Sequence, residues 1–208
     1  MFDDKPYVFC IAITSGLSGS CNAAMIAKAD YEAQFPGRKV CVIDSLSTGG
    51  EMELIAEKIQ ELIAADLSFE DICEKIKVYQ TSTGLLFMLE SLQNLANNGR
   101  VSKIVAKAAG ILGIRLVGKA SDVGTLEMLE KPRGEKKAVA ATYKTMLELG
   151  YEGGKVYIAH CMNPSAAEKL CGSILADFPG AFVEIYRCGG LCSFYAEKGG
   201  MLIGFEKM

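Results

Sequence analysis

The stretch YVFCIAI at Tyr7–Ile13, followed by TSGLSGS at 14–20, decides the fold of this chain. An uninterrupted apolar run of this length is typical of a buried strand, and the glycine-rich turn ends it. The alanine-rich residues 22–35 favour a helix, and Val40–Ile43 is a second short apolar run. Two continuous apolar strands joined through a helix predict a parallel βαβ unit with both sheet faces covered.

The rest of the chain continues with helices and then with short strands. Apolar residues at helical spacing predict helices over 51–64 and 69–79, the second capped by Ser68, and the first domain is expected to end there. Beyond residue 80 the pattern mixes short strands with helices, which is typical of an α+β domain. The residues 85–89 are compatible with either a strand or a helix. The expected helices are 91–96, 102–112, 135–149 and 164–176, and the expected strands are 115–118, 125–130, 156–161, 182–187 and 201–205.

We therefore predict the α/β fold class and two domains. A parallel βαβ first domain, incomplete, covers residues 1–80, and an α+β domain with a mixed or antiparallel sheet covers residues 81–208.

The bulk composition excludes several classes of protein. With 208 residues, 50% of them hydrophobic, the chain can bury a real core, so disorder is not expected. A net charge of -3 gives no general attraction to nucleic acid. No run approaches the roughly 20 apolar residues that span a bilayer, and the first residues lack the positive charge of a secretory signal. The eight cysteines are scattered among aliphatic residues, as in a reduced cytoplasmic protein.

The turn after the first strand is the best candidate binding site. Backbone N–H groups at the start of a helix lack partners within the helix, so Thr14, Ser15 and Ser18 around them would complete an anion site. Gly16 lets the chain turn tightly and lets a ligand approach the backbone. The alternative interpretation is simply a well-capped helix start. The turn has neither a Walker lysine nor the GxGxxG spacing of a dinucleotide site.

Five motifs in order resemble the DegV family of fatty-acid-binding proteins, and together they cover nearly all of the chain. The motifs are ITSGLSGS at 13–20, VIDS at 42–45, GRVSK at 99–103, LGIRLVGK at 112–119 and KPRGEKKA at 131–138.

The resemblance implies a carrier without catalytic activity and without a cofactor. A long-chain fatty acid would lie between two domains as the ligand, with its carboxylate on the hydroxyls of Thr14 and Ser15 and with Ser18 close behind. Arg100 resembles a group at the pocket mouth. Lys131 and Arg133 resemble a surface that docks a fatty-acid kinase. The simpler interpretation is a cation behind a helix end for Arg100 and a solvated basic flank for 131–137.

Two departures from the family pattern bear on the ligand site. Nothing before Tyr7 resembles the family's first strand with its Thr-Asp-Ser motif or its Thr-rich ligand loop, so the opening part of the first domain is expected to be missing. Exposed strand edges and apolar faces would then favour self-association. Ala196 aligns with a histidine that reaches the carboxylate in the family, with Tyr195 or Lys198 as replacements. A module with a decayed pocket is therefore a further alternative.

Other chemistry receives weaker support. His160 and Cys161 end one strand, and Cys188 and Cys192 flank an expected turn at Gly189–Gly190, which is a weak zinc pattern. An enzyme, either a phosphotransferase component or a hydrolase, could use the serine-rich turn, although the sequence has no GxSxG elbow and only one histidine.

Overall fold

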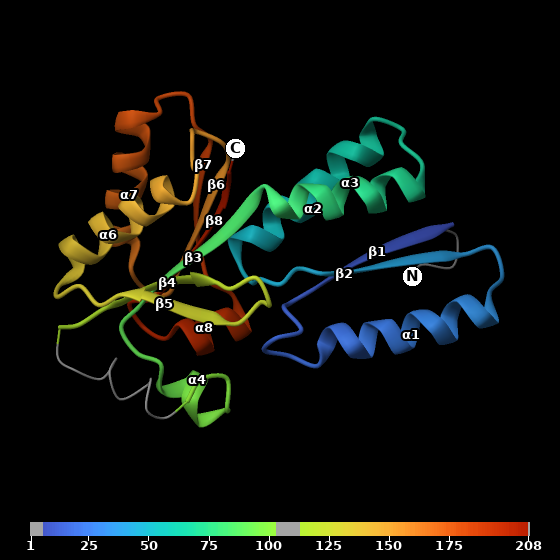
Figure 1. Ribbon diagram of the computed structural model, residues 1–208, viewed down its shortest axis with the longest axis horizontal. Coiled ribbons are helices and arrows are strands. Elements are labelled where there is room, and N and C mark those ends of the chain that lie inside the picture. Colours follow the sequence, from blue (N-terminus) through green and yellow to red (C-terminus); the bar gives the residue numbers. More distant parts are fainter. Residues whose placement is uncertain (1–5, 103–112, 208) are drawn as a thin grey trace.

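The computed structural model describes residues 6–102 and 113–207 (Figure 1). Its first part is a two-stranded sheet of β1 (Tyr7–Ala12) and β2 (Lys39–Asp44), connected through α1 (Ser20–Gln34). The strands pair in parallel from Tyr7 opposite Lys39 to Ala12 opposite Asp44. The predicted βαβ unit is thus confirmed.

Two further helices join this small sheet to the rest of the molecule. They are α2 (Gly50–Ala64) and α3 (Phe69–Thr81), which pack against each other and against Ile43 through Ile55, Ile59, Ile72 and Ile76. The start of α2 also lies directly on the larger sheet, where a Cβ atom on Gly50 would lie 2.6 Å from the Tyr157 carbonyl oxygen. Because α2 touches both sheets, it fixes their relative positions.

The larger sheet has six strands in the order β5-β4-β3-β8-β6-β7. All neighbouring strands are antiparallel except β6 and β7, which are parallel, so the predicted mixed sheet is confirmed. The strands are β3 (Thr83–Leu89), β4 (Leu116–Ala120), β5 (Leu126–Glu130), β6 (Val156–His160), β7 (Val183–Arg187) and β8 (Met201–Glu206).

Helices cover the two faces of this sheet unequally. On one face α6 (Glu135–Glu148) and α7 (Pro164–Asp177) bury a core that includes Leu86, Ile158 and Ile203. On the other face the short helices α4 (Gln93–Asn97) and α8 (Gly190–Ala196) lie over a second core that includes Phe87 and Leu202, and the start of α2 packs beside them (Figure 1). Among the described residues no helix is both long and apolar enough to cross a membrane.

Most element predictions are confirmed, and one is wrong. Gly189–Gly190 is not an open turn, because Gly190 already begins α8. The uncertain residues 85–89 belong to β3, which is buried on both faces and therefore lacks a polar alternation. The expected helix 102–112 lies largely outside the described residues. The division at residue 80 stays a prediction.

Candidate ligand-binding site

An apolar cavity of about 170 Å³ lies where the β1–α1 turn meets the α8 face of the larger sheet. The turn and its surroundings contribute Ile13, Leu17, Ser18 and Thr48, and α8 contributes Leu191, Cys192, Tyr195 and Ala196. The remaining lining residues are Leu89, Leu95, Arg100, Leu126 and Leu202. Residues far apart in the sequence thus enclose a single cavity with an apolar wall.

The cavity has a few polar groups on its wall. The Arg100 Nε donates to the Leu17 carbonyl oxygen at 3.2 Å, and Nη1 donates to the Asn98 carbonyl oxygen. The guanidinium carbon lies 5.9 Å from the centre of the Tyr195 ring. Since a guanidinium has five N–H donors, these contacts hold the cation on the cavity wall while engaging only part of its donors.

Ser18 is the predicted hydroxyl that lies on this cavity. Its Oγ lies 3.1 Å from the Ser20 Oγ and accepts from the Ser20 backbone N–H at 3.2 Å. The helix itself begins behind Gly19, which provides no side-chain cap. The Ser18 hydroxyl beside the cavity is therefore hydrogen-bonded within its own turn.

Thr14, Ser15 and Gly16 lie elsewhere in the turn. The Thr14 hydroxyl is buried, donates to the Gly124 carbonyl oxygen at 2.8 Å and accepts from the Gly16 N–H at 3.1 Å. It borders a smaller neighbouring cavity of about 30 Å³. Ser15 is exposed, and its backbone N–H donates to Asp44 Oδ1 at 3.0 Å. Thr14 thus ties the turn to the β4–β5 hairpin, and neither Ser15 nor Gly16 lines the main cavity.

The position where the family pattern has histidine also faces the cavity. Ala196 is buried at the end of α8 and lines the hollow, as does Tyr195. Lys198 is exposed and is not among the lining residues. Of the two residues considered as replacements for the histidine, only Tyr195 lines the cavity.

The helix α8 is the part of the site that sequence reasoning missed. Its signal was the helical spacing of Leu191, Cys192 and Tyr195, which the preceding glycine pair obscured. Four of its residues line the cavity, so this short helix forms a whole wall.

The predicted docking residues lie away from the cavity. Lys131 and Arg133 are exposed and follow the end of β5, whereas Leu126, at the start of that strand, lines the hollow. Arg133 also forms an isolated β-bridge with Ile114. The docking role of these residues stays a prediction.

The zinc pattern does not produce a metal site in the described part of the chain, where no group of three or more suitable side chains could hold an ion. His160, Cys161 and Cys188 line a separate cavity of about 340 Å³, whereas Cys192 lines the apolar one. The His160 Nδ1 accepts from the Asn163 N–H at 3.2 Å, and burial lowers the pKa of the imidazole. This ring is therefore a hydrogen-bonded strand-end residue.

Comparison with known proteins agrees with this geometry. The family model described as "Uncharacterised protein, DegV family COG1307" matches residues 3–207. A DegV domain-containing protein of Streptococcus pneumoniae strain R6 is 47% identical over 205 residues, which are 99% of this chain and 73% of that protein.

Two solved structures are close in both sequence and shape. A DegV family protein from Eubacterium eligens, loaded with heptadecanoic acid, is 44% identical with a TM-score of 0.96 over 100% of this chain and 75% of its own. The Streptococcus pneumoniae Fatty Acid Kinase (Fak) B3 protein, loaded with linoleic acid, is 46% identical with a TM-score of 0.97 over 100% of this chain and 74% of its own. The chain belongs to the DegV family.

Proposed function

We propose that this protein binds a long-chain fatty acid in the cavity between the β1–α1 turn and α8, and that it performs no chemistry on it. The observation that carries the proposal is the cavity wall, which is apolar apart from a few groups that include Ser18 and Arg100. Such a wall suits an acyl chain with one polar end. The fatty acids in the Eubacterium and Streptococcus relatives support the same class of ligand.

The energetics divide between the tail and the headgroup. Each buried CH₂ contributes about 0.8 kcal/mol before the entropy of binding is subtracted. A charge-assisted hydrogen bond to the carboxylate contributes about 1.5–3 kcal/mol. The tail thus supplies most of the affinity, and the headgroup contacts set its direction in the cavity.

The cavity must widen to hold a whole acyl chain. Its volume of about 170 Å³ is below the roughly 300–1,000 Å³ of ordinary ligand pockets. The small cavity beside Thr14 shares Leu17, Thr48, Leu126 and Leu202 with the main one. Rearrangement of these shared side chains would join the two cavities. The acyl tail would then extend from the main cavity into the smaller one beside Thr14.

Among the predicted site residues, Arg100 and Ser18 are best placed to meet the carboxylate, because both line the cavity. Thr14 would have to exchange its bond to Gly124 for one to the ligand, and Ser15 and Gly16 would have to move towards the hollow. We therefore place the carboxylate beside Arg100.

The fate of the ligand is a further part of the proposal. Similarity to the Fak B3 protein supports presentation of the carboxylate to a fatty-acid kinase. The scattered cysteines favour the cytoplasm as the place of this step. The exposed Lys131 and Arg133 would provide the docking charge for that partner.

The test begins with the purified protein, extracted and examined by mass spectrometry for bound fatty acids. We expect co-purified long-chain acids, and Arg100→Leu should weaken palmitate binding by about 10- to 100-fold. The matched control is Lys198→Leu, which removes an exposed cation near α8 that does not line the cavity. A ligand-free protein that gains no thermal stability from palmitate or oleate would contradict the proposal and support a decayed pocket. Turnover of a small phosphate or ester would favour the enzyme instead.

A further inference from the structure

Two cysteines follow directly after neighbouring parallel strands. The ladder between β6 and β7 ends with His160 opposite Arg187, so the next register position sets Cys161 beside Cys188. The Cys188 N–H donates to the His160 carbonyl oxygen at 2.9 Å, which continues the ladder by one step. The Cys161 N–H donates to the Gly200 carbonyl oxygen at 2.8 Å and stays aligned with β8. Both residues lie just beyond their strands, and these backbone hydrogen bonds continue the pairing by one position.

This geometry suits a disulfide. Neighbouring strands lie about 4.8 Å apart, and Cα atoms joined through a disulfide lie roughly 4.4–6.8 Å apart. Facing residues of adjacent strands project from the same side of a sheet, and both cysteines pack against the core on the α8 face. The two thiols thus project from one face of the sheet, and the usual strand spacing lies within the Cα range of disulfides.

Cys161 and Cys188 are accessible from a cavity, whereas the third nearby cysteine, Cys192, contacts Thr48. Cys161 and Cys188 line the cavity of about 340 Å³, together with Met162, Arg187 and Ser193. In contrast, the Cys192 Sγ lies 3.6 Å from the Thr48 Oγ1 and borders the fatty-acid cavity. A small oxidant can therefore reach the first two thiols from a hollow that Cys192 does not line.

We propose that Cys161 and Cys188 are a redox-modified pair that a peroxide converts into a disulfide. The Cys161 thiol reduces the peroxide, becomes a sulfenic acid and releases one water. The Cys188 sulfur then attacks that of Cys161, the S–S bond forms, and the hydroxyl leaves with the Cys188 proton as a second water. Two thiols lose two electrons, and a reducing thiol reverses the reaction.

The order of the steps follows from burial. Burial, with the neighbouring thiols of Cys192 and Cys161, raises the pKa of Cys188 to about 12. A thiol with such a pKa is a poor first nucleophile near neutral pH, so Cys161 reacts first and Cys188 closes the bond within the molecule.

The disulfide would act on the wall of the ligand cavity. The Cys161 Sγ donates to the Ser193 carbonyl oxygen of α8 at 3.7 Å, and the Ser193 Oγ donates to the Cys188 carbonyl oxygen at 2.6 Å. Oxidation removes the weak S–H contact and ties the strand ends covalently at the base of α8. The thiol state is thereby coupled to the helix that encloses the cavity.

The experiment treats the reduced protein with hydrogen peroxide and maps its peptides under non-reducing conditions. We expect a peptide that links Cys161 to Cys188 and that dithiothreitol removes. Cys161→Ser and Cys188→Ser should each abolish it, whereas Cys171→Ser, which alters a half-buried thiol on the opposite face, should retain it. The oxidised wild-type protein should also melt several degrees higher, because the bond constrains the unfolded chain.

Three results would overturn the proposal. They are an unlinked pair that still accepts an alkylating reagent after oxidation, a link from Cys188 to Cys192 instead, and a Cys161–Cys188 link that dithiothreitol does not remove. None of these measurements involves a fatty acid, so their outcome is independent of the proposed lipid binding.

Discussion

Gly16 allows the β1–α1 turn to lie directly against the β4–β5 hairpin. A Cβ atom there would lie 2.6 Å from the Val123 carbonyl oxygen and 2.9 Å from that of Gly124, and both are backbone atoms that cannot rotate away. We expect Gly16→Ala to lower the free energy of unfolding by about 1–3 kcal/mol, measured by denaturant titration. Gly19→Ala is the matched control, since its Cβ would meet nothing within 4 Å. Equal stability of the two variants would contradict this close contact.

The same turn shows how far residue roles can be predicted from sequence. The motif located the turn, and both Ser18 and Arg100 do line the cavity. The sequence could not show that the Thr14 hydroxyl bonds to Gly124, because that partner lies 110 residues away and only the folded chain brings the two together. Local patterns identify polar groups near a helix start, whereas long-range packing decides which of them remain available.

Helix caps were predictable at the scale of single elements because they depend on residues only a few positions apart. The Ser68 Oγ accepts from the Asp71 N–H at 3.1 Å at the start of α3, and the Asn163 side chain accepts from the Ala166 N–H at the start of α7. We expect Ser68→Ala to cost about 1 kcal/mol of unfolding free energy. Asn163→Ala should cost more, because its buried amide also donates to the Gly199 carbonyl oxygen at 3.0 Å.

Denaturant midpoints of these two variants, with Ser68→Thr as the control that retains a capping oxygen, check the expectation. A Ser68→Ala variant as stable as the wild-type protein would show that this exposed cap contributes nothing.

Elements without a local signal were harder to predict. β3 is a central strand buried on both faces, so its residues lack the alternation that separates a strand from a helix. The helix α8 has only seven residues and begins at a glycine pair. It packs on α4 and borders the cavity. These contacts involve residues distant in the sequence, so they cannot be predicted from residues 190–196 alone.

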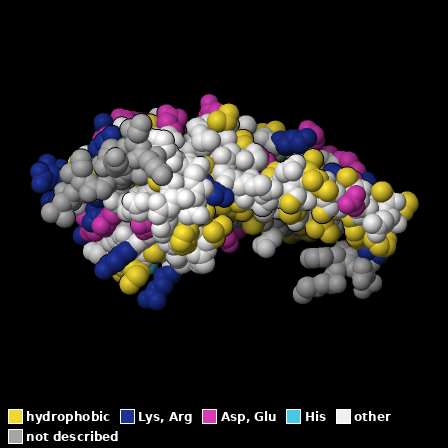
Figure 2. Space-filling view, turned by 90° about the horizontal axis from the view of Figure 1, so that it is seen from below, with side chains coloured by type: hydrophobic (Ala, Val, Ile, Leu, Met, Phe, Trp, Pro, Cys, Tyr) yellow, Lys and Arg dark blue, Asp and Glu magenta, His cyan; other side chains and the backbone are white. Residues whose placement is uncertain are grey.

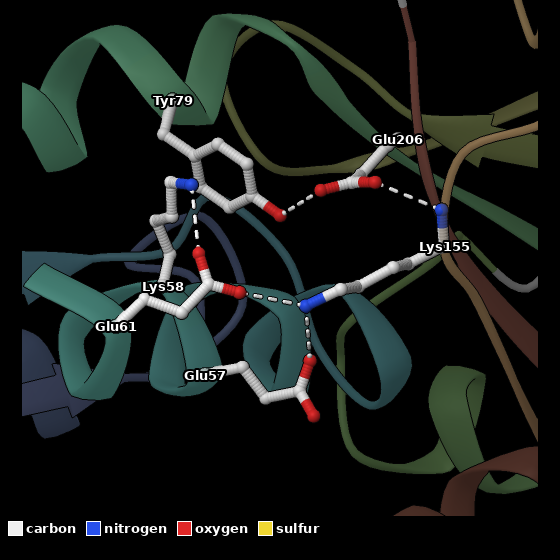
Figure 3. A network of polar contacts seen from close by, with 6 residues as sticks. All are labelled: Glu57, Lys58, Glu61, Tyr79, Lys155 and Glu206. Carbon is white, nitrogen blue, oxygen red and sulfur yellow. Dashed lines mark hydrogen bonds and ion pairs between the residues drawn. The ribbon is translucent and has the colours of Figure 1, made fainter. Parts of the chain in front are cut away.

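A polar network joins the first part of the molecule to the larger sheet (Figure 3). The Lys155 Nζ lies 2.8 Å from Glu61 Oε1 and 3.1 Å from Glu57 Oε2, both on α2. The Tyr79 hydroxyl of α3 donates to Glu206 Oε1 on β8 at 2.7 Å, and Glu206 Oε2 accepts from the Lys155 N–H at 2.8 Å. The network therefore connects both helices to the end of β8 and to the residue before β6, two interior strands of the sheet.

Lys155 should matter more than an ordinary surface lysine. Its hydrogen bond to Glu61 lowers the pKa of that carboxyl below its usual value of 4.5. The stabilisation is thus present above pH 4.5 and is lost as the pH falls through the lowered pKa. We expect Lys155→Ala to cost about 1 kcal/mol at pH 7, a difference that shrinks towards acidic pH. The measurement is denaturant titration at pH 7 and at an acidic pH below the pKa of Glu61. Lys144→Ala, which removes only an exposed ion pair with Glu148, is the control.

The first part of the molecule leaves apolar side chains uncovered. A parallel sheet is normally buried on both faces, yet four of the six β2 residues and five of the six β1 residues are only half-buried. On α1 the exposed fractions are 50% for Met25 and 58% for Ile26, and Phe35 behind the helix is also exposed. Figure 2 shows hydrophobic side chains spread over the end of the molecule that carries α1. Exposed apolar side chains gathered at one end of a molecule favour association.

We therefore expect the protein to self-associate through α1, with a sedimentation coefficient that rises with protein concentration. Ile26→Lys should shift the population towards the monomer, because a charge at the contact must be desolvated when two copies meet. Val78→Lys on α3 is the control, since Val78 is 67% exposed but lies on a different helix. A wild-type protein that sediments as a monomer at every concentration would show that the exposed apolar residues of α1 do not cause association. An equal effect of both lysines would place the contact elsewhere.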